Sequence, residues 1–242
     1  MEFSRFFMPR ERWDSAPYLD GDEAKHLTQV LRIRTGETVV VFDGLGRSAM
    51  ATVTEARKQH VTLQLGNVTT SPRPCPDITL AQAVPKGKNM DWIVQKSVEL
   101  GVAKVQPLLT SHSVALPRDE KSAKWCRTAL EACKQCGQDL LPTVAEPAQI
   151  IPWLERLAQP EPSELRLIAS LAPGARPLRE VMRQHPQTRQ ATVLIGPEGD
   201  FSPGETASAL QAGFLPVTLG NIVLRVETAA LFSLAALRCE FG

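Results

Sequence analysis

Long apolar runs are missing from this sequence. No stretch approaches the roughly 20 residues that a membrane-spanning helix needs, although 43% of the 242 residues are hydrophobic. The N-terminus carries charged residues at Glu2 and Arg5 and has no apolar stretch long enough for a secretory signal. We therefore expect a cytoplasmic protein that makes no contact with a membrane.

The cysteine pattern excludes a disulfide framework. Five cysteines are present, an odd number at irregular spacing. Cys133 and Cys136 have the C-x-x-C spacing, but a zinc site needs two further ligands and no second Cys or His pair lies nearby. A redox pair would open a helix directly after a strand, whereas this pair falls late in a helical pattern. We interpret both as half-buried helix residues and expect no metal.

An excess of charge of one sign is also missing. The net charge is +1, so any contact with a nucleic acid needs a local basic patch. Residues 25–58 hold six basic and three acidic side chains. This segment is a candidate patch, and the solvated face of an ordinary domain is the alternative.

Residues 1–71 have the pattern of a small β-rich domain. The expected strands are 37–44, 48–56 and 60–65, and they surround one helical stretch at 22–31. We expect them to form a small barrel. Three prolines within residues 72–77 then exclude a helix or a central strand. We interpret 72–77 as a linker between two domains.

Residues 78–242 alternate between strand and helix patterns. The expected strands are 78–84, 102–109, 165–171, 191–195 and 214–219. The expected helices are 89–100, 121–136, 178–184, 203–212 and 227–241. Such alternation predicts a three-layer α/β domain with a mostly parallel sheet.

A glycine loop follows the strand that ends at Ile195. Gly196 and Gly199 permit a sharp turn and a close approach of the backbone to a ligand. Ser202 and Glu205 have the spacing of a capping box at the start of the next helix. Ligands in open α/β sheets bind at the carboxyl ends of strands, where this loop lies.

The chemistry of this loop differs from that of a phosphate loop. Both glycine patterns typical of phosphate binding are missing, and Glu198 and Asp200 would repel a phosphate. Two acids favour a neutral or cationic ligand, and a sulfonium cofactor fits better than a nucleoside triphosphate. The alternative is that the loop is only a tight connection.

A second glycine loop follows the strand that ends at Leu219. Gly220 opens this loop, and Arg225, Glu227 and Thr228 lie at the mouth of the last helix. We expect the two loops, which leave successive strands, to face one crevice. The alternative for Arg225 and Glu227 is a capping pair on the surface.

Both loops resemble the signature of the RsmE family of 16S ribosomal RNA uridine-N3 methyltransferases, in the SPOUT superfamily. The matching residues are Ile195-Gly196-Pro197-Glu198-Gly199, and Leu219-Gly220 with Leu224-Arg225-x-Glu227-Thr228-Ala229. Further matches are Lys86-Gly87-x-x-Met90-Asp91-Trp92-x-x-Gln95-Lys96-x-x-Glu99-Leu100-Gly101-Val102, His26-Leu27-x-x-Val30-Leu31-Arg32 and Phe42-Asp43-Gly44. The resemblance therefore covers nearly the whole chain in order.

This resemblance implies a fold, a cofactor and partners. The fold is a SPOUT-type, trefoil-knotted parallel-sheet domain at 78–242 behind a small PUA-like RNA-binding β-barrel at 1–71. The cofactor is S-adenosylmethionine, and the partners are 16S ribosomal RNA of the small subunit and a second copy in a homodimer. The expected cofactor-binding residues are Leu171, Ile195, Gly196, Pro197, Glu198, Gly199, Leu219, Gly220, Ile222 and Leu224. The expected RNA-binding residues are Arg5, Arg10, Lys25, Arg32 and Arg34.

Three residues are candidates for catalysis. Arg225 is expected to polarise a uracil carbonyl and stabilise the developing anion. Glu227 or Glu198 is expected to accept the N3 proton, directly or through water. For Glu198 the alternative is a role in the turn and in the charge at the helix N-terminus. We assign His26 to packing.

The chain also departs from the family pattern. Asp200 replaces a common glycine, Val226 a common threonine, and Gln138 a common arginine. Residues 111–113, Ser-His-Ser, replace Glu-Arg-Ser. Two other functions fit the sequence: a SPOUT methyltransferase for another RNA base, and a catalytically silent RNA-binding module on the ribosome.

Overall fold

The chain divides into two compact units. A computed structural model of the chain describes residues 3–14, 16–113, 119–172 and 174–242. The small unit comprises the residues up to Arg73 together with Leu130–Leu141, and the large unit comprises Pro74–Ala129 and Pro142–Gly242. No helix in the described ranges is long and apolar enough to cross a membrane.

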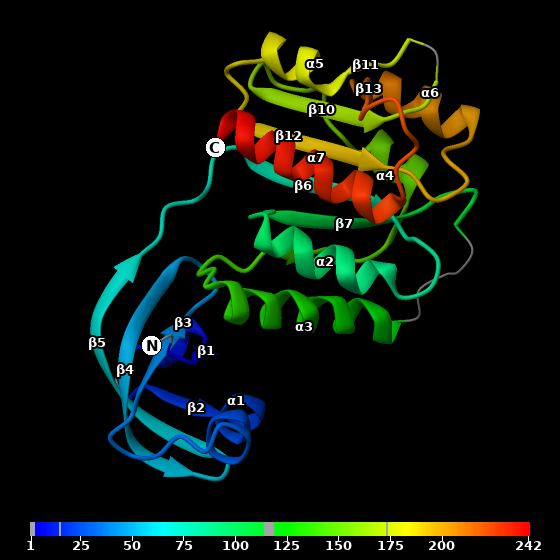
Figure 1. Cartoon of the computed structure of the whole chain (residues 1–242). Coiled ribbons are helices and arrows are strands. Elements are labelled where there is room, and N and C mark those ends of the chain that lie inside the picture. Colours follow the sequence, from blue (N-terminus) through cyan, green and yellow to red (C-terminus); the bar gives the residue numbers. More distant parts are fainter. Residues whose placement is uncertain (1–2, 15, 114–118, 173) are drawn as a thin grey trace. The chain divides into compact units, whose positions relative to one another are not determined.

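The small unit is built on a curled sheet of five strands. Its strands are β1 (Arg5–Phe7), β2 (Tyr18–Asp20), β3 (Thr38–Phe42), β4 (Arg47–Arg57) and β5 (His60–Thr70), in the order β1-β3-β4-β5-β2. Two register shifts interrupt the pairing of β4 with β5, and such bulges bend strands and increase twist. The predicted barrel is therefore a half-barrel sheet (Figure 1).

The predicted helical stretch at 22–31 is present, and its second half is π-helical. Helix η1 (Arg10–Arg12) precedes β2, and α1 (Gly21–Lys25) continues into the π-helical turn η2 (His26–Val30). Alternate residues along the strands point inward and bury a core with Leu27 of η2. That core contains Phe6, Met8, Trp13, Leu19, Ala24, Leu27, Val39, Val41, Ala49, Ala51, Val53, Val61 and Leu63.

The large unit holds an all-parallel sheet. Its strands are β6 (Asp77–Ala83), β7 (Lys104–Leu109), β8 (Thr143–Val144), β9 (Ala148–Gln149), β10 (Glu164–Ala169), β11 (Arg176–Pro177), β12 (Gln190–Ile195) and β13 (Leu215–Thr218). The order is β11-β13-β10-β12-β6-β7-β8, with β9 also paired to β7. Every pairing is parallel, as the alternating pattern predicted.

Helices cover both faces of this sheet. They are α2 (Asn89–Glu99), α4 (Ile150–Glu155), α5 (Leu178–Gln184), α6 (Pro203–Gln211) and α7 (Val226–Phe241), and α3 (Asp119–Cys136) begins in this unit. Helices α4 and α6 pack on Ala81, Leu108, Ile168 and Leu194 of one face. Helices α2 and α7 lie over the other (Figure 1), which confirms three layers.

Sequence patterns located most of these elements and missed the shortest. Helix α5 has the predicted bounds, and the other long elements shift by one to three residues at most ends. Strand β5 runs to Thr70, five residues past its predicted end. Strands β1, β2, β8, β9 and β11 and helices η1 and α4 were not predicted, because two to six residues are too few to display a period.

Candidate functional site

A pocket of about 490 Å³ opens at the carboxyl end of the parallel sheet. The ends of β10, β12 and β13 and the start of α7 form it. The lining residues are Asn89, Ala169, Ser170, Leu171, Ile195, Gly196, Pro197, Glu198, Asp200, Thr218, Leu219, Gly220, Ile222, Val223, Leu224, Arg225, Val226, Glu227 and Ala229. Its volume lies in the range typical of small-molecule sites.

Strand order explains why the two glycine loops meet. Strands β12 and β13 follow each other in the chain, but β10 lies between them in the sheet. Ile168 of β10 pairs with Leu194 on one side and with Pro216 on the other. The loops therefore flank the end of β10, which places Ala169–Leu171 in the pocket.

The first glycine loop is fixed to α6 by the predicted capping box. The Ser202 side chain accepts a hydrogen bond from the Glu205 N–H at 3.3 Å, and a Glu205 carboxylate oxygen accepts one from the Ser202 N–H at 2.8 Å. The other Glu205 oxygen accepts from the Ser111 N–H at 2.7 Å and from the Ser111 hydroxyl at 3.1 Å. One buried carboxylate thus joins the loops that follow β7 and β12.

These bonds control the ionisation of Glu205. Burial by itself raises the pKa of the carboxyl, but the hydrogen bonds from Ser202 and Ser111 outweigh burial and hold the pKa below its ordinary value. The charged form is therefore favoured in the folded chain.

Backbone geometry explains how aspartate is accommodated at position 200, where the resemblance predicts glycine. Asp200 adopts a φ of +60°, a left-handed conformation that glycine adopts without cost. The Asp200 carboxylate accepts a hydrogen bond from the Phe201 N–H at 2.8 Å. Aspartate tolerates this conformation better than most residues because its short side chain bonds locally.

The two glycines of the first loop lie against different side chains. A Cβ on Gly196 would lie 3.2 Å from the Phe201 ring, and Gly196 lines the pocket. A Cβ on Gly199 would lie 3.3 Å from His112, whose Nδ1 is 2.8 Å from the Asp200 carbonyl oxygen. The structure therefore places Gly199 against His112, outside the pocket lining.

The second glycine loop presents main chain to the pocket. Gly220 has a φ of +137°, and the Thr218 hydroxyl donates to its carbonyl at 3.0 Å. Within the described ranges no hydrogen bond involves the main chain of 221–224. Ile222 and Val223 are 77% and 75% exposed. Free amides and carbonyls beside apolar side chains suit a flat heterocycle with polar edges.

Charged groups surround the pocket unevenly. Arg225, at the N-cap of α7, is exposed. Glu227 accepts a hydrogen bond from the Asn89 amide at 3.4 Å, and Glu198 accepts one from the Lys86 N–H at 3.0 Å. With Asp200, the lining holds three carboxylates and one guanidinium, a balance that suits a cationic ligand.

The predicted site residues mostly gather in this pocket. Every predicted cofactor-binding residue except Gly199 lines it, as do Arg225, Glu227 and Glu198. Sequence reasoning missed Asn89, Ala169, Ser170, Asp200, Thr218, Val223, Val226 and Ala229 as lining residues. The end of the expected strand at 165–171 was the available signal for Ala169 and Ser170.

The five predicted RNA-binding residues are not equivalent. Arg10, Lys25, Arg32 and Arg34 are exposed. Arg5 instead forms an ion pair with Asp139, its guanidinium lies 5.0 Å from the centre of the Phe42 ring, and its side chain is 15% exposed. Ser48 and Ser71 also donate to Asp139, at 2.9 and 2.8 Å. We therefore assign Arg5 to packing within the small unit.

The C-x-x-C pair lies at the end of α3. Burial raises the pKa of the Cys133 thiol to about 12, so that thiol stays protonated and unreactive at neutral pH. Cys136 is exposed. The part of the chain that the structure describes contains no group of three His, Cys, Asp or Glu side chains arranged to hold a metal. His26 packs edge-on against Phe6, with 6.1 Å between ring centres.

Two parts of the chain match family models of RNA methyltransferases. Residues 71–238 match the RNA methyltransferase domain family, and residues 19–66 match the RNA methyltransferase PUA domain. A ribosomal RNA small subunit methyltransferase E from Synechocystis is 31% identical over 236 residues, covering 97% of this chain and 77% of the relative. The chain belongs to the ribosomal RNA small subunit methyltransferase E family.

Two solved structures of similar chains carry a bound cofactor. A Neisseria gonorrhoeae ribosomal RNA small subunit methyltransferase E, bound to S-adenosylmethionine, is 30% identical, covers 98% of both chains and has a TM-score of 0.86. A Legionella pneumophila protein described as a methyltransferase in complex with SAM is 32% identical, covers 99% of this chain and 98% of its own, and has a TM-score of 0.87. The parallel-sheet methyltransferase domain and the PUA-like domain of the predicted fold class are confirmed, and the trefoil knot stays a prediction.

Replacing Glu205 by Gln is expected to lower the free energy of unfolding by about 1 kcal/mol at pH 7. Because the pKa of Glu205 is lowered on folding, its charge stabilises the fold above the ordinary value of 4.5, and this contribution is lost as the pH falls through the lowered pKa. Urea unfolding across pH measures the difference.

The matched control is Glu180→Gln, which removes an exposed acid from the first turn of α5. This change is expected to alter stability by less than about 0.5 kcal/mol. Equal stability of Glu205→Gln and the unsubstituted chain at pH 7 would contradict the assigned role of Glu205.

Proposed function

We propose that this protein transfers a methyl group from S-adenosylmethionine to N3 of a uridine in 16S ribosomal RNA of the small subunit. The pocket at the ends of β10, β12 and β13 carries the proposal, because it joins main-chain polar groups, apolar walls and a surplus of carboxylates. These features fit an adenine edge, a flat ring and a sulfonium respectively. Two relatives with this fold were solved with the cofactor bound.

The cofactor would be held mainly by the two glycine loops. Leu171, residues 195–198, Leu219, Gly220 and residues 222–224 line the pocket and would contact it. When bound, S-adenosylmethionine supplies a methyl group on a sulfur that is its own leaving group. The task of the protein is therefore to hold the uracil ring in line with that methyl group, and positioning supplies a large share of the rate enhancement.

Arg225 and an acidic residue would act on the uracil. Arg225 is exposed at the pocket mouth, where its guanidinium can donate to a ring carbonyl and stabilise negative charge as N3 loses its proton. Glu227 is the better proton acceptor of the two candidates, because the Asn89 amide orients its carboxylate. Glu198 is tied to the Lys86 N–H, which favours its alternative role in the turn.

Labelled S-adenosylmethionine mixed with unmodified small-subunit RNA, free and in the assembled subunit, tests the reaction. Label is expected in uridine methylated at N3, identified by mass spectrometry of the nucleosides. Arg225→Ala is expected to lower turnover about 100-fold while calorimetry shows unchanged cofactor binding. Glu227→Gln is expected to lower turnover, because an amide cannot accept the N3 proton.

Arg179→Ala is the matched control for Arg225→Ala, because it removes an exposed arginine of α5 and is expected to leave turnover unchanged. Label in another base would identify a methyltransferase of different target. Failure to bind the cofactor would favour the silent RNA-binding module.

The small unit would contact the RNA backbone. Its exposed cations Arg10, Lys25, Arg32 and Arg34 can bind phosphates without reading sequence. The proposed division of the chain is an RNA-binding domain at 1–71, a linker at 72–77 and a methyltransferase domain at 78–242. Arg32→Gln/Arg34→Gln is expected to lower RNA affinity and its salt dependence, measured by fluorescence anisotropy, and to leave cofactor affinity unchanged. An unchanged salt dependence would count against this role.

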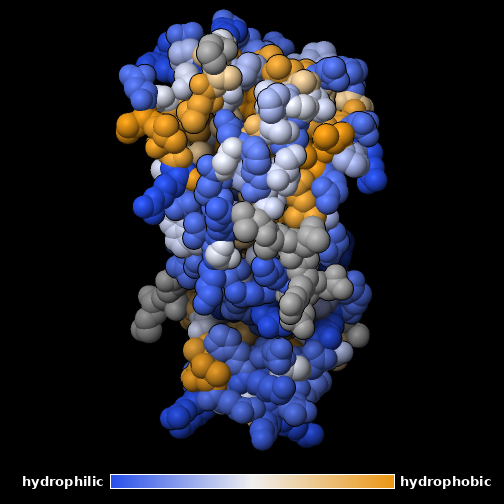
Figure 2. Space-filling model, turned by 90° about the vertical axis from the view of Figure 1, so that its right-hand side faces the viewer, coloured by the Kyte–Doolittle hydropathy of each residue, from blue (hydrophilic) through white to orange (hydrophobic). Residues whose placement is uncertain are grey.

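A homodimer is the proposed assembly. Apolar side chains lie exposed near the pocket and on α7: Leu171, Ile222, Val223 and Phe232 are 64%, 77%, 75% and 47% exposed. Figure 2 shows apolar surface gathered in patches over the large unit, and such patches mark interfaces. Light scattering is expected to give twice the chain mass, and Phe232→Asp to give the monomer.

Leu210→Asp is the matched control for the dimer, because Leu210 is 46% exposed on α6, across the sheet from α7. A monomeric mass for the unsubstituted chain would overturn the assembly.

A further inference from the structure

A second cavity, of about 290 Å³, lies between the start of α2 and the start of α3 in the large unit. Its lining residues are Val84, Pro85, Lys86, Gly87, Lys88, Met90, Asp91, Lys121, Lys124 and Trp125. Val84, Pro85, Met90 and Trp125 are buried and form an apolar floor. The lysines lie at its rim, since all four are exposed.

Lysines outnumber acids in this cavity by four to one. Lys124 forms an ion pair with Asp91, which also accepts a hydrogen bond from the Trp125 indole at 3.1 Å. These contacts fix the floor and neutralise one lysine. The structure gives Lys86, Lys88 and Lys121 no ion pair with a described residue. The cavity therefore presents a concentrated positive charge, although the whole chain carries only +1.

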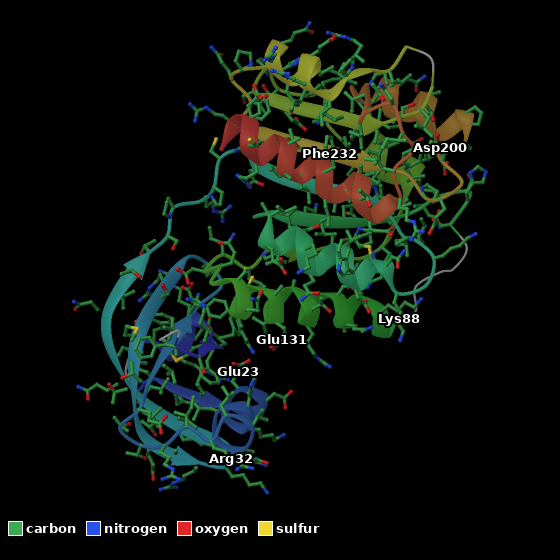
Figure 3. The ribbon with its side chains drawn as sticks, viewed as in Figure 1. Glu23, Arg32, Lys88, Glu131, Asp200 and Phe232 are labelled. Carbon is green, nitrogen blue, oxygen red and sulfur yellow. The ribbon has the colours of Figure 1, made fainter. Side chains whose placement is uncertain are left out.

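The two cavities adjoin. Asn89 lines the first, whereas its neighbours Lys88 and Met90 line the second. The Lys86 N–H donates to Glu198 of the first cavity at 3.0 Å. Lys88 and Asp200 both lie at the end of the sheet to which the strands point (Figure 3). A nucleotide whose base enters the first cavity would carry its backbone past this lysine rim.

The charges of the two cavities are opposite. Carboxylates predominate around the first, which suits a cationic donor, and lysines predominate around the second, which suits an anion. We propose that the lysine cavity binds phosphates of the RNA strand next to the target uridine and so orients that base toward the donor. This inference rests on the proposed function. Lysine binds phosphate as a point charge, so the cavity adds affinity without reading sequence.

The test is the binding of a short single-stranded oligoribonucleotide to Lys88→Gln/Lys121→Gln. Each lost phosphate contact is expected to reduce the salt slope by about 0.7 and, in 0.1 M salt, the affinity by about five-fold. A DNA strand of the same sequence is expected to lose affinity by the same factor, because both strands carry the same phosphates. Affinity for S-adenosylmethionine is expected to stay unchanged.

Lys96→Gln is the matched control. It makes the same change of charge on α2, where Lys96 pairs with Glu99 at 2.7 Å, and it is expected to leave the salt slope unchanged. An unchanged slope for the double variant would overturn the proposal, and so would a loss confined to RNA. The assay needs no methyl transfer, so a chain that binds through these lysines but transfers no label would overturn only the proposed function.

Discussion

Parallel pairing of β10 with both β12 and β13 is the constraint on which the pocket depends. Because β10 stands between the two strands that carry the glycine loops, the loops are held one strand apart, with Ala169–Leu171 below them. A direct pairing of β12 with β13 would bring the loops together without this gap. The buried Glu205 carboxylate then ties the β12 loop to Ser111 after β7, so four strands fix the geometry.

Much of the large unit could be predicted from the sequence, because its elements are long enough to show a period. The capping box at Ser202 is local chemistry, and the structure contains it as predicted. Strand order is not local, and nothing in the sequence predicted β10 between β12 and β13. The packing of Leu130–Leu141 with the small unit is equally invisible, because it joins segments far apart in the chain.

The site shows the same difference between local features, which the sequence predicted, and contacts between distant segments, which it did not. Glycine spacing and family resemblance identified most of the lining, since most of those residues lie in two loops, each of which is continuous in the sequence. Asn89 enters from α2, and no local pattern marks it. Arg5 illustrates the opposite error: an N-terminal arginine was expected to face RNA, but Asp139, distant in sequence, binds it within the small unit. The sequence alone does not show which carboxylate an arginine will pair with in the folded chain.

The second glycine loop offers main-chain amides and carbonyls to the pocket, and this limits what a point mutation can change there. Side-chain replacement alters the wall of a pocket but leaves amides and carbonyls where the backbone holds them. Ile222 and Val223 point largely to solvent, so their replacement would leave the polar edge intact. An inhibitor that bonds to that edge would therefore meet few routes to resistance by point mutation, because escape would require the loop itself to change its course.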